Sequence, residues 1–418
     1  MELAPKYRML IIMAISMVVT WSAFIPLINI ARRNRLMDNP GSRKLQHNPV
    51  PVLGGAAVFL GVTVGLCCFK TMLSYTSLFA VLGAMIVMLY VGMMDDILSL
   101  KPSLRLVTEV VVCTLLVYGT RFAICNFQGI FGTDHIPGLI SIPLSVFAGV
   151  GIINAINMID GIDGLVSGFG IMACTLFGVV FFIGRDYSFA ALAMVTAGAL
   201  IPFFLHNVFG EKSKMYIGDG GSMMLGLILF SMVTSLTRYV SNYQEYITYN
   251  FGLIPFSLAV LSLPVFDTLR VMTGRIMRGT SPFKADQTHL HHVFIHAGFS
   301  HLATTLSLIT LDLAVVAIWS LVWIGGASVP VQLCASLAAG IFLTMFPAIF
   351  ISWHAKRGTR FYTWLRGIAA YTHVENTRPW RWLRGWLDRE RSGGLAAWSD
   401  KEPEEVSPGI GEPDTGKR

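Results

Sequence analysis

The chain is built from long apolar runs separated by short polar segments. Runs of about 18 to 25 predominantly apolar residues are long enough to cross a bilayer. Helices are expected for such runs, because backbone groups within lipid must hydrogen-bond to one another. The pattern therefore predicts an all-α polytopic membrane protein. The eleven candidate spans are residues 9–30, 53–70, 74–94, 104–120, 141–159, 165–184, 188–206, 220–238, 251–272, 302–325 and 329–353.

Composition indicates the same class of protein. The 418 residues are 54% hydrophobic and 13% charged, whereas a soluble domain carries about a quarter charged residues. The formal net charge of +7 does not indicate a nucleic-acid partner, since the basic residues lie between apolar runs rather than in one patch. The first run is long enough to span the bilayer, so we expect an anchor rather than a cleavable signal peptide.

The distribution of Lys and Arg predicts the orientation of the spans. With the N-terminus outside, 25 of the 31 Lys and Arg residues fall in cytoplasmic segments and six fall outside. This bias satisfies the positive-inside rule in one direction only. We therefore expect an external N-terminus and a cytoplasmic C-terminus.

Acidic and amide residues gather on the predicted cytoplasmic side. Asp95 and Asp96 end the third run, the stretch 154–163 joins the fifth and sixth, Asp219 opens the eighth and Asp267 closes the ninth. Polar groups near hydrocarbon are costly and mark functional sites. Because the topology rests on basic residues alone, this clustering is an independent indication of an enzyme that faces the cytoplasm.

Three segments are expected along the chain. Residues 1–355 form the transmembrane domain. Residues 356–391 are basic and rich in Trp, which suits a cytoplasmic helix lying on an anionic membrane surface. Residues 392–418 are rich in Gly, Pro and Glu, which predicts a disordered tail.

The acidic segments are candidates for metal and phosphate chemistry. Asn157, Asp160 and Asp163 recur every three residues and would share a helix face. Mg²⁺ prefers oxygen ligands and keeps several waters, which leaves room for substrate phosphates. Asp219 lies between glycines at a helix N-terminus and could hold a metal beside backbone amides. The alternatives are a polar interhelical loop around Asp160 and an ordinary N-cap at Asp219.

The adjacent carboxylates Asp95 and Asp96 also permit two interpretations. They could orient a metal-bound phosphate or supply a base, or they could be solvated acids beside Lys101 and Arg105. Glu109 follows Arg105 by one helical turn and is expected to pair with it.

Two basic loops are candidates for anion binding. The segment 281–292 contains Asp286 and three His within four positions. Zinc binding is the alternative, but no Cys or H-E-x-x-H pattern accompanies these His, and nearby Arg275 supplies a cationic donor. We favour phosphate and nucleotide binding for this loop. For the loop that contains Lys44, the residues favour two interpretations equally: binding of a lipid phosphate, and simple placement of basic residues on the cytoplasmic side.

The motifs together resemble one family, the polyprenyl-phosphate N-acetylhexosamine-1-phosphate transferases. The resemblance covers residues 31–300 and the N-acetylglucosaminyl branch in particular, because Leu290 interrupts the His run that the muramoyl-pentapeptide branch carries uninterrupted. The motifs that carry it are Asp95-Asp96 with Lys101 and Arg105, Asn154-x-x-Asn157-x-x-Asp160-Gly-x-Asp163-Gly, Gly218-Asp219-x-Gly-Ser222 and Ser281-Pro-Phe-x-x-Asp286-x-x-His289-x-His291-His292.

The resemblance implies a reaction and a role for each residue. Undecaprenyl phosphate would attack the sugar-linked phosphorus of a UDP-N-acetylhexosamine, and UMP would leave. UDP-GlcNAc is the default donor; GalNAc, QuiNAc and FucNAc are alternatives. Mg²⁺ would be the cofactor, with Mn²⁺ as a substitute, and the enzyme would lie in a bacterial inner membrane, where a homodimer is compatible with the sequence. The implied catalytic residues are Asp95, Asp96, Asp160, Asp163 and His291; the substrate-binding residues are Lys44, Lys101, Asn154, Arg275, Asp286, His289 and His292; the metal ligands are Asp219 and Asn157.

Three other membrane proteins use acidic motifs. A prenyltransferase would carry Asp-x-x-x-Asp clusters on two helices, and a CDP-alcohol phosphotransferase would carry an Arg that the segment 163–167 lacks. An ion-coupled transporter would place its acids near the bilayer centre, whereas here they lie at one face. The sequence therefore favours the sugar-1-phosphate transferase.

Overall fold

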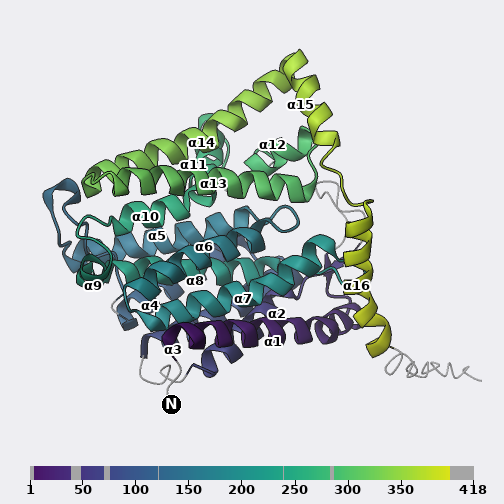
Figure 1. Cartoon of the computed structure of the whole chain (residues 1–418), viewed down its shortest axis with the longest axis horizontal. Coiled ribbons are helices and arrows are strands. Elements are labelled where there is room, and N and C mark those ends of the chain that lie inside the picture. Colours follow the sequence, from purple (N-terminus) through teal and green to yellow (C-terminus); the bar gives the residue numbers. More distant parts are fainter. Residues whose placement is uncertain are drawn as a thin grey trace, which may run out of the picture.

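The structure is a computed structural model that describes residues 4–38, 49–69, 76–120, 122–238, 240–282 and 287–395. It is a bundle of long helices that lie side by side (Figure 1). The nine long apolar helices in the described residues are α1 (Pro5–Arg33), α3 (Thr76–Leu98), α4 (Pro102–Thr120), α5 (Gly138–Met158), α6 (Leu165–Ile183), α7 (Tyr187–Phe209), α8 (Gly218–Arg238), α13 (His301–Ile324) and α14 (Val329–Arg357).

The expected class is confirmed, since these helices are long and apolar enough to cross a membrane. Two further predicted runs take other forms. The run 53–70 forms α2 (Gly54–Cys67), which has only 14 residues. The run 251–272 is divided into α10 (Leu253–Val260) and α11 (Ser262–Met277), which meet at a bend of 71°.

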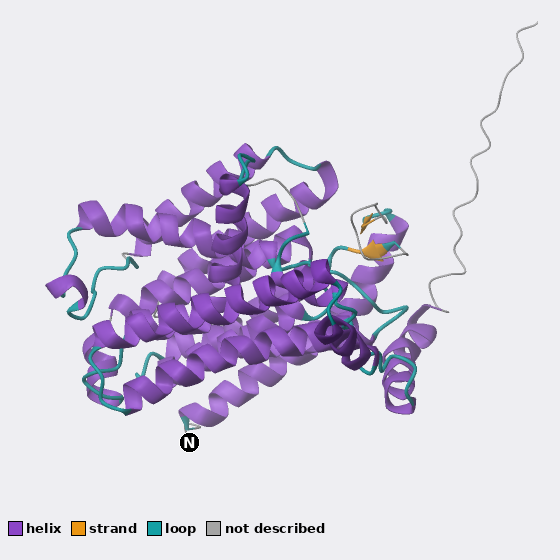
Figure 2. Ribbon diagram, turned by 90° about the horizontal axis from the view of Figure 1, so that it is seen from above, coloured by secondary structure: helices purple, strands orange, loops and turns teal. Residues whose placement is uncertain are grey.

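The remaining elements are short. β1 (Met37–Asp38) and β2 (Val50–Pro51) form an antiparallel pair, which lies at one end of the bundle in Figure 2. The helices outside the predicted spans are η2 (Ile130–Gly132), α9 (Val240–Tyr246), α12 (Leu290–His296), α15 (Arg360–Ala370) and α16 (Arg378–Leu395). α16 includes the first four residues of the segment for which we expected disorder, and residues 396–418 lie outside the described residues.

The bundle is organised around α8, which is buried along almost its whole length. Small residues let other helices approach its N-terminal turn closely, as is common in membrane bundles. A Cβ on Gly92 of α3 would collide with the backbone of Gly220, and one on Gly221 would lie 2.7 Å from the Cα of Gly55 in α2. The C-terminal end of α3 is therefore held against the start of α8.

Candidate active site

The start of α8 and the end of α3 bring two acidic segments together. The Asp219 backbone amide donates to Asp96 Oδ1 over 3.1 Å. Gly218 permits this arrangement because it has a φ of +70°, and because a Cβ there would lie 2.5 Å from Asp96 Oδ2. The motifs around residues 95 and 219 thus meet as the sequence predicts.

Arg105 of α4 contacts three acids and one amide, which together lie on four helices. Its Nη1 lies 3.2 Å from Asp95 Oδ2 and 3.5 Å from Asp219 Oδ2. Its Nη2 donates to Asn157 Oδ1 over 2.6 Å, and its Nε lies 3.3 Å from Glu109 Oε1, which confirms the expected pair. One guanidinium therefore contacts three carboxyl groups and fixes their spacing.

The amides at the end of α5 complete this network. Asn157 Nδ2 donates to Asp219 Oδ1 over 2.8 Å and lies 2.9 Å from Ser222 Oγ. Asn154 donates to Glu109 Oε2, a carboxylate that is fully buried. The sequence missed Ser222 as a partner of Asn157, although Ser222 follows Asp219 by three residues and so lies within one helical turn of it.

Asp163 forms a second charged group beyond α5. Lys214 Nζ donates to Asp163 Oδ2 over 2.7 Å, and His301 Nδ1 lies 2.8 Å from the same oxygen. Burial acts to raise the pKa of Asp163, but the His301 hydrogen bond and the Lys214 charge outweigh it and lower the pKa below its ordinary value. Asp163 is therefore a carboxylate at neutral pH.

The His-rich loop is anchored by Asp267 of α11. Asp267 Oδ2 lies 2.9 Å from His289 Nδ1, and its carboxylate also accepts the Leu290 backbone amide over 3.1 Å and 3.2 Å. Arg270 Nη2 contacts Asp267 Oδ1 at 2.5 Å and the Thr288 carbonyl at 2.8 Å. His289 is buried in this network, so its clearest role is to fix the start of α12.

The other two His of the loop differ, because His291 is buried and His292 lines the pocket. His291 is 2% exposed and stacks on His289, with ring centroids 5.7 Å apart. It packs so closely on Gly161 that a Cβ there would collide with its ring. Burial and the neighbouring His rings lower the pKa of His291 well below its ordinary value, so the ring is neutral. His292 lines the pocket instead.

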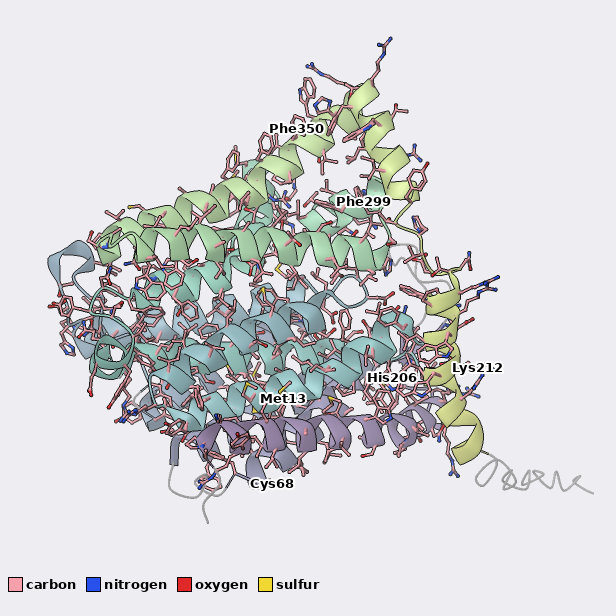
Figure 3. All side chains as sticks on the ribbon, in the orientation of Figure 1. Met13, Cys68, His206, Lys212, Phe299 and Phe350 are labelled. Atoms are coloured by element: carbon pink, nitrogen blue, oxygen red, sulfur yellow. The ribbon has the colours of Figure 1, made fainter. Side chains whose placement is uncertain are left out.

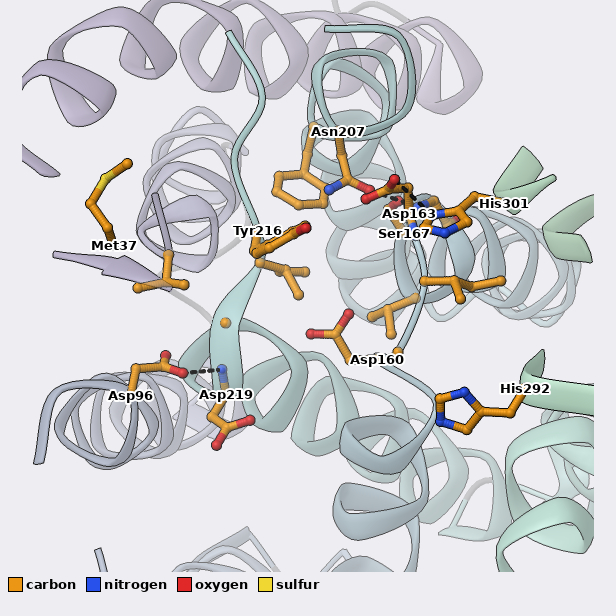
Figure 4. Close-up of a pocket in the computed structure, with 18 residues that line it drawn as sticks. Met37, Asp96, Asp160, Asp163, Ser167, Asn207, Tyr216, Asp219, His292 and His301 are labelled. Carbon is orange, nitrogen blue, oxygen red and sulfur yellow. Dashed lines mark hydrogen bonds and ion pairs between the residues drawn. The ribbon is translucent and has the colours of Figure 1, made fainter. Parts of the chain in front are cut away.

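A cavity of about 420 Å³ lies beside these groups, and its polar lining includes Asp96, Asp163, Asp219, His292 and His301. Figure 4 shows Asp96 and Asp219 on one side, Asp163 with His301 on another, and Asp160 pointing into the space between them. Tyr216 and Asn207 complete the wall near the end of α7. The cavity therefore has one acidic side and a second side with imidazole groups, which suits a phosphorylated ligand accompanied by a cation.

Comparisons with known proteins agree with this chemistry. The model of glycosyl transferase family 4 matches residues 78–237. A decaprenyl-phosphate N-acetylglucosaminephosphotransferase of Mycobacterium leprae is 32% identical over 292 residues, which cover 65% of this chain and 73% of that protein. The chain belongs to the polyprenyl-phosphate N-acetylhexosamine-1-phosphate transferase family.

Enzymes named for undecaprenyl phosphate are also similar. The undecaprenyl-phosphate alpha-N-acetylglucosaminyl 1-phosphate transferase of Escherichia coli K12 is 26% identical over 291 residues, covering 69% of this chain and 76% of that protein. Its namesake from Yersinia pestis is 25% identical over 331 residues, covering 78% and 88%. The family assignment from the motifs is thereby confirmed.

Some residues that the family resemblance implicated do not line the cavity. Lys101 is exposed before α4. Arg275 is buried and donates to the Pro282 carbonyl over 2.6 Å, so it supports the base of the His-rich loop. Lys44 and Asp286 lie outside the described residues.

The acids of this family member fit a Mg²⁺ ion that binds together with substrate phosphates. Among the residues that the structure describes, no three His, Cys, Asp or Glu side chains converge as a complete metal cage. Mg²⁺ does not require one, since it commonly uses one or two carboxylates plus waters and phosphates. Asp96 Oδ2 is buried and has no hydrogen-bond partner in the described part of the chain. Such an oxygen beside Asp219 is a group that a cation would satisfy.

Several partners of the site residues could not be predicted, because they lie far away in the sequence. Lys214 and His301 reach Asp163 from 51 and 138 residues away. Asn207 accepts from the Gly164 amide over 2.6 Å and donates to the Met215 carbonyl over 3.0 Å. The one available signal was their position at predicted span ends on the same membrane side as the acids.

Proposed function

We propose that this chain transfers N-acetylglucosamine-1-phosphate from UDP-GlcNAc to undecaprenyl phosphate. The support is the meeting of Asp96, Asp160, Asp163 and Asp219 around one cavity, in a chain whose relatives are named for this sugar phosphate and for undecaprenyl or decaprenyl phosphate. An oxygen of the lipid phosphate forms a bond to the sugar-linked phosphorus. The bond from that phosphorus to the UMP oxygen breaks, and UMP leaves with the electron pair.

The proposed topology has eleven spans, an external N-terminus and a cytoplasmic C-terminus. Nine long helices support it, with α2 and the bent α10–α11 pair as the remaining crossings. The enzyme then lies in a bacterial inner membrane. Its site faces the cytoplasm, where sugar nucleotides are made. Residues 1–355 form the transferase domain, and residues 356–391 lie on the membrane surface.

Charge balance is the argument for Mg²⁺, or Mn²⁺ in its place. Among the described residues the site gathers six carboxyl groups, of Asp95, Asp96, Glu109, Asp160, Asp163 and Asp219, but two Lys or Arg side chains, Arg105 and Lys214. Both substrates add phosphate charge. A divalent ion held by Asp219 would neutralise the phosphates and stabilise the charge that develops during transfer.

The hydrogen bonds assign different tasks to the residues around that ion. The amide nitrogen of Asn157 donates to Asp219 and Ser222, and its oxygen accepts from Arg105. Asn157 therefore orients Asp219, and its oxygen would keep a second lone pair for the ion. Asp95 accepts from the Leu100 amide over 2.7 Å and from Arg105, which makes it a support for the network. Asp96 is the member of the acidic pair that lines the cavity.

No proton needs to be removed from the lipid phosphate near neutral pH. A phosphate monoester has a second pKa of about 6, so it is mostly dianionic. Phosphoryl transfer depends chiefly on positioning and charge neutralisation. We therefore assign Asp96 and Asp160 to positioning, and His292 and His301 to contacts with the donor phosphates.

The experiment measures UMP release in membranes that contain Asp219→Asn. We expect normal protein levels, no metal-dependent UMP release, and loss of wild-type activity with EDTA that Mg²⁺ restores. Asp134→Asn is the matched control, because Asp134 is an exposed acid in the loop before α5. Turnover by Asp219→Asn at the wild-type rate would rule out Asp219 as the metal ligand. Wild-type membranes that release no UMP would refute the reaction itself.

A further inference from the structure

α16 lies across the C-terminal ends of α1 and α7 in Figure 1. Its inner face is packed against them. Trp386 lies 5.2 Å from Trp21 of α1, and Trp380 lies 4.6 Å from Phe209 of α7, measured between ring centroids. Leu387 is 1% exposed. The C-terminal helix is thus a docked part of the fold and not only a charged surface segment.

Asp388 connects α16 to the loop between α7 and α8. Its carboxylate accepts the Ser213 backbone amide and the Ser213 hydroxyl, each over 2.9 Å, and the Lys212 amide over 3.3 Å. Figure 3 shows Lys212 beside α16. Hydrogen bonds to a carboxylate are roughly twice as strong as neutral ones. Arg384 also pairs with Glu211 over 3.1 Å, but Glu211 is 70% exposed, so that pair contributes little.

The same loop leads directly into the active site. Lys214, next to Ser213, donates to Asp163. Beyond it, the Tyr216 amide donates to the Pro51 carbonyl over 2.8 Å, and residues 216–219 form one wall of the cavity. Because Ser213 is adjacent to Lys214, a displacement of Ser213 would shift Lys214 relative to Asp163.

We propose that Asp388 is a positioning residue for the side of the active site that contains Asp163 and His301, to which we assign the sugar nucleotide. It holds the loop of residues 210–217 so that Lys214 meets Asp163 and Tyr216 meets the cavity. This role rests on the proposed function for the identity of the donor. It is distinct from membrane binding by the basic face of α16, because Asp388 is acidic and points to the loop.

The kinetic test compares three variants in the full-length protein. Asp388→Ala removes the acceptor, Asp388→Asn keeps an acceptor oxygen, and Arg389→Ala changes the next, exposed residue of α16. For Asp388→Ala we expect the KM for UDP-GlcNAc to rise about tenfold, since a charge-assisted hydrogen bond is worth roughly one factor of ten. We expect kcat and the KM for undecaprenyl phosphate to stay within about twofold. Asp388→Asn should recover most of the loss, and Arg389→Ala should match the wild type.

Hydrogen exchange tests the contact without any assumption about the reaction. In Asp388→Ala, amides of residues 210–217 should exchange faster, while those of α13 should not change. Equal exchange and an unchanged KM in Asp388→Ala would overturn the proposal. A loss of kcat with an unchanged donor KM, or an equal defect in Arg389→Ala, would also overturn it. If wild-type enzyme releases no UMP, the proposed reaction fails. Faster exchange in the loop of Asp388→Ala would still support the proposal that Asp388 positions residues 210–217.

Discussion

Removing the Arg105 guanidinium is the sharpest perturbation of the charged network. Arg105→Met keeps an apolar stem of similar length but leaves Asp95, Glu109 and Asp219 without their shared cation. The three side chains are 14%, 0% and 35% exposed. The loss in free energy of unfolding therefore differs among the three, and the loss from the buried Glu109 should be the largest.

The exposed fractions of these side chains determine how much free energy of unfolding Arg105→Met loses. Breaking a buried pair by removing one partner costs about 3–5 kcal/mol, and this applies to Glu109. The partly exposed pairs of Asp95 and Asp219 are screened by solvent and should contribute below about 1 kcal/mol each. We expect a total loss near 4 kcal/mol, which corresponds to a fall in Tm on the order of 5–10 °C.

A double-mutant cycle with Glu109→Gln tests the assignment. Glutamine fills the same space without charge, so Arg105→Met with Glu109→Gln should be more stable than Arg105→Met alone, with a coupling energy of about 1–3 kcal/mol. Thermal unfolding of detergent-purified protein measures this. UMP release should stay low in the double variant, because the acids near the cavity still lack their cation. A double variant no more stable than Arg105→Met would refute the reasoning, and full recovery of activity would show that Arg105 acts only through Glu109.

Two further predictions concern the second side of the cavity. His292→Ala should raise the KM for UDP-GlcNAc several-fold with little change in Tm, whereas His291→Ala, at a site 2% exposed, should lower Tm by opening a cavity; equal Tm values would contradict this division. Lys214→Met should raise the pKa of Asp163 toward 3.8, its ordinary value. A depressed carboxylate pKa stabilises the fold above the unfolded pKa and loses that contribution as pH falls through the folded pKa. The variant should therefore be less stable than the wild type near neutral pH, and thermal unfolding between about pH 6 and 3 should show a smaller loss of stability on acidification; an equal or larger loss would contradict this assignment.

The spans and the acidic motifs could be predicted because each depends on local sequence. A run of apolar residues must form its own hydrogen bonds in lipid, so its length predicts a helix. The exceptions depend on tertiary contacts. α2 has only 14 residues, and its first turn packs closely against α8 at Gly55. The bend between α10 and α11 is stabilised by Asp312 of α13, which accepts from the Leu263 amide over 2.7 Å and from Ser262 over 2.6 Å. No local sequence pattern predicts these bonds, because Ser262 and Leu263 lie 50 and 49 residues before Asp312.

The role of each side chain within a motif could not be predicted from the sequence, because burial determines which side chain reaches the cavity. Asp95 and Asp96 are adjacent and chemically identical, yet a helix turns successive residues by about 100°, so one meets Arg105 and the other meets the cavity. His291 and His292 separate in the same way. A motif therefore predicts which segment takes part in the chemistry, and the packing of its helix selects the side chain that reaches the substrate. Exchanging the two roles would require a rotation of α3 that the contact of Gly92 with Gly220 prevents.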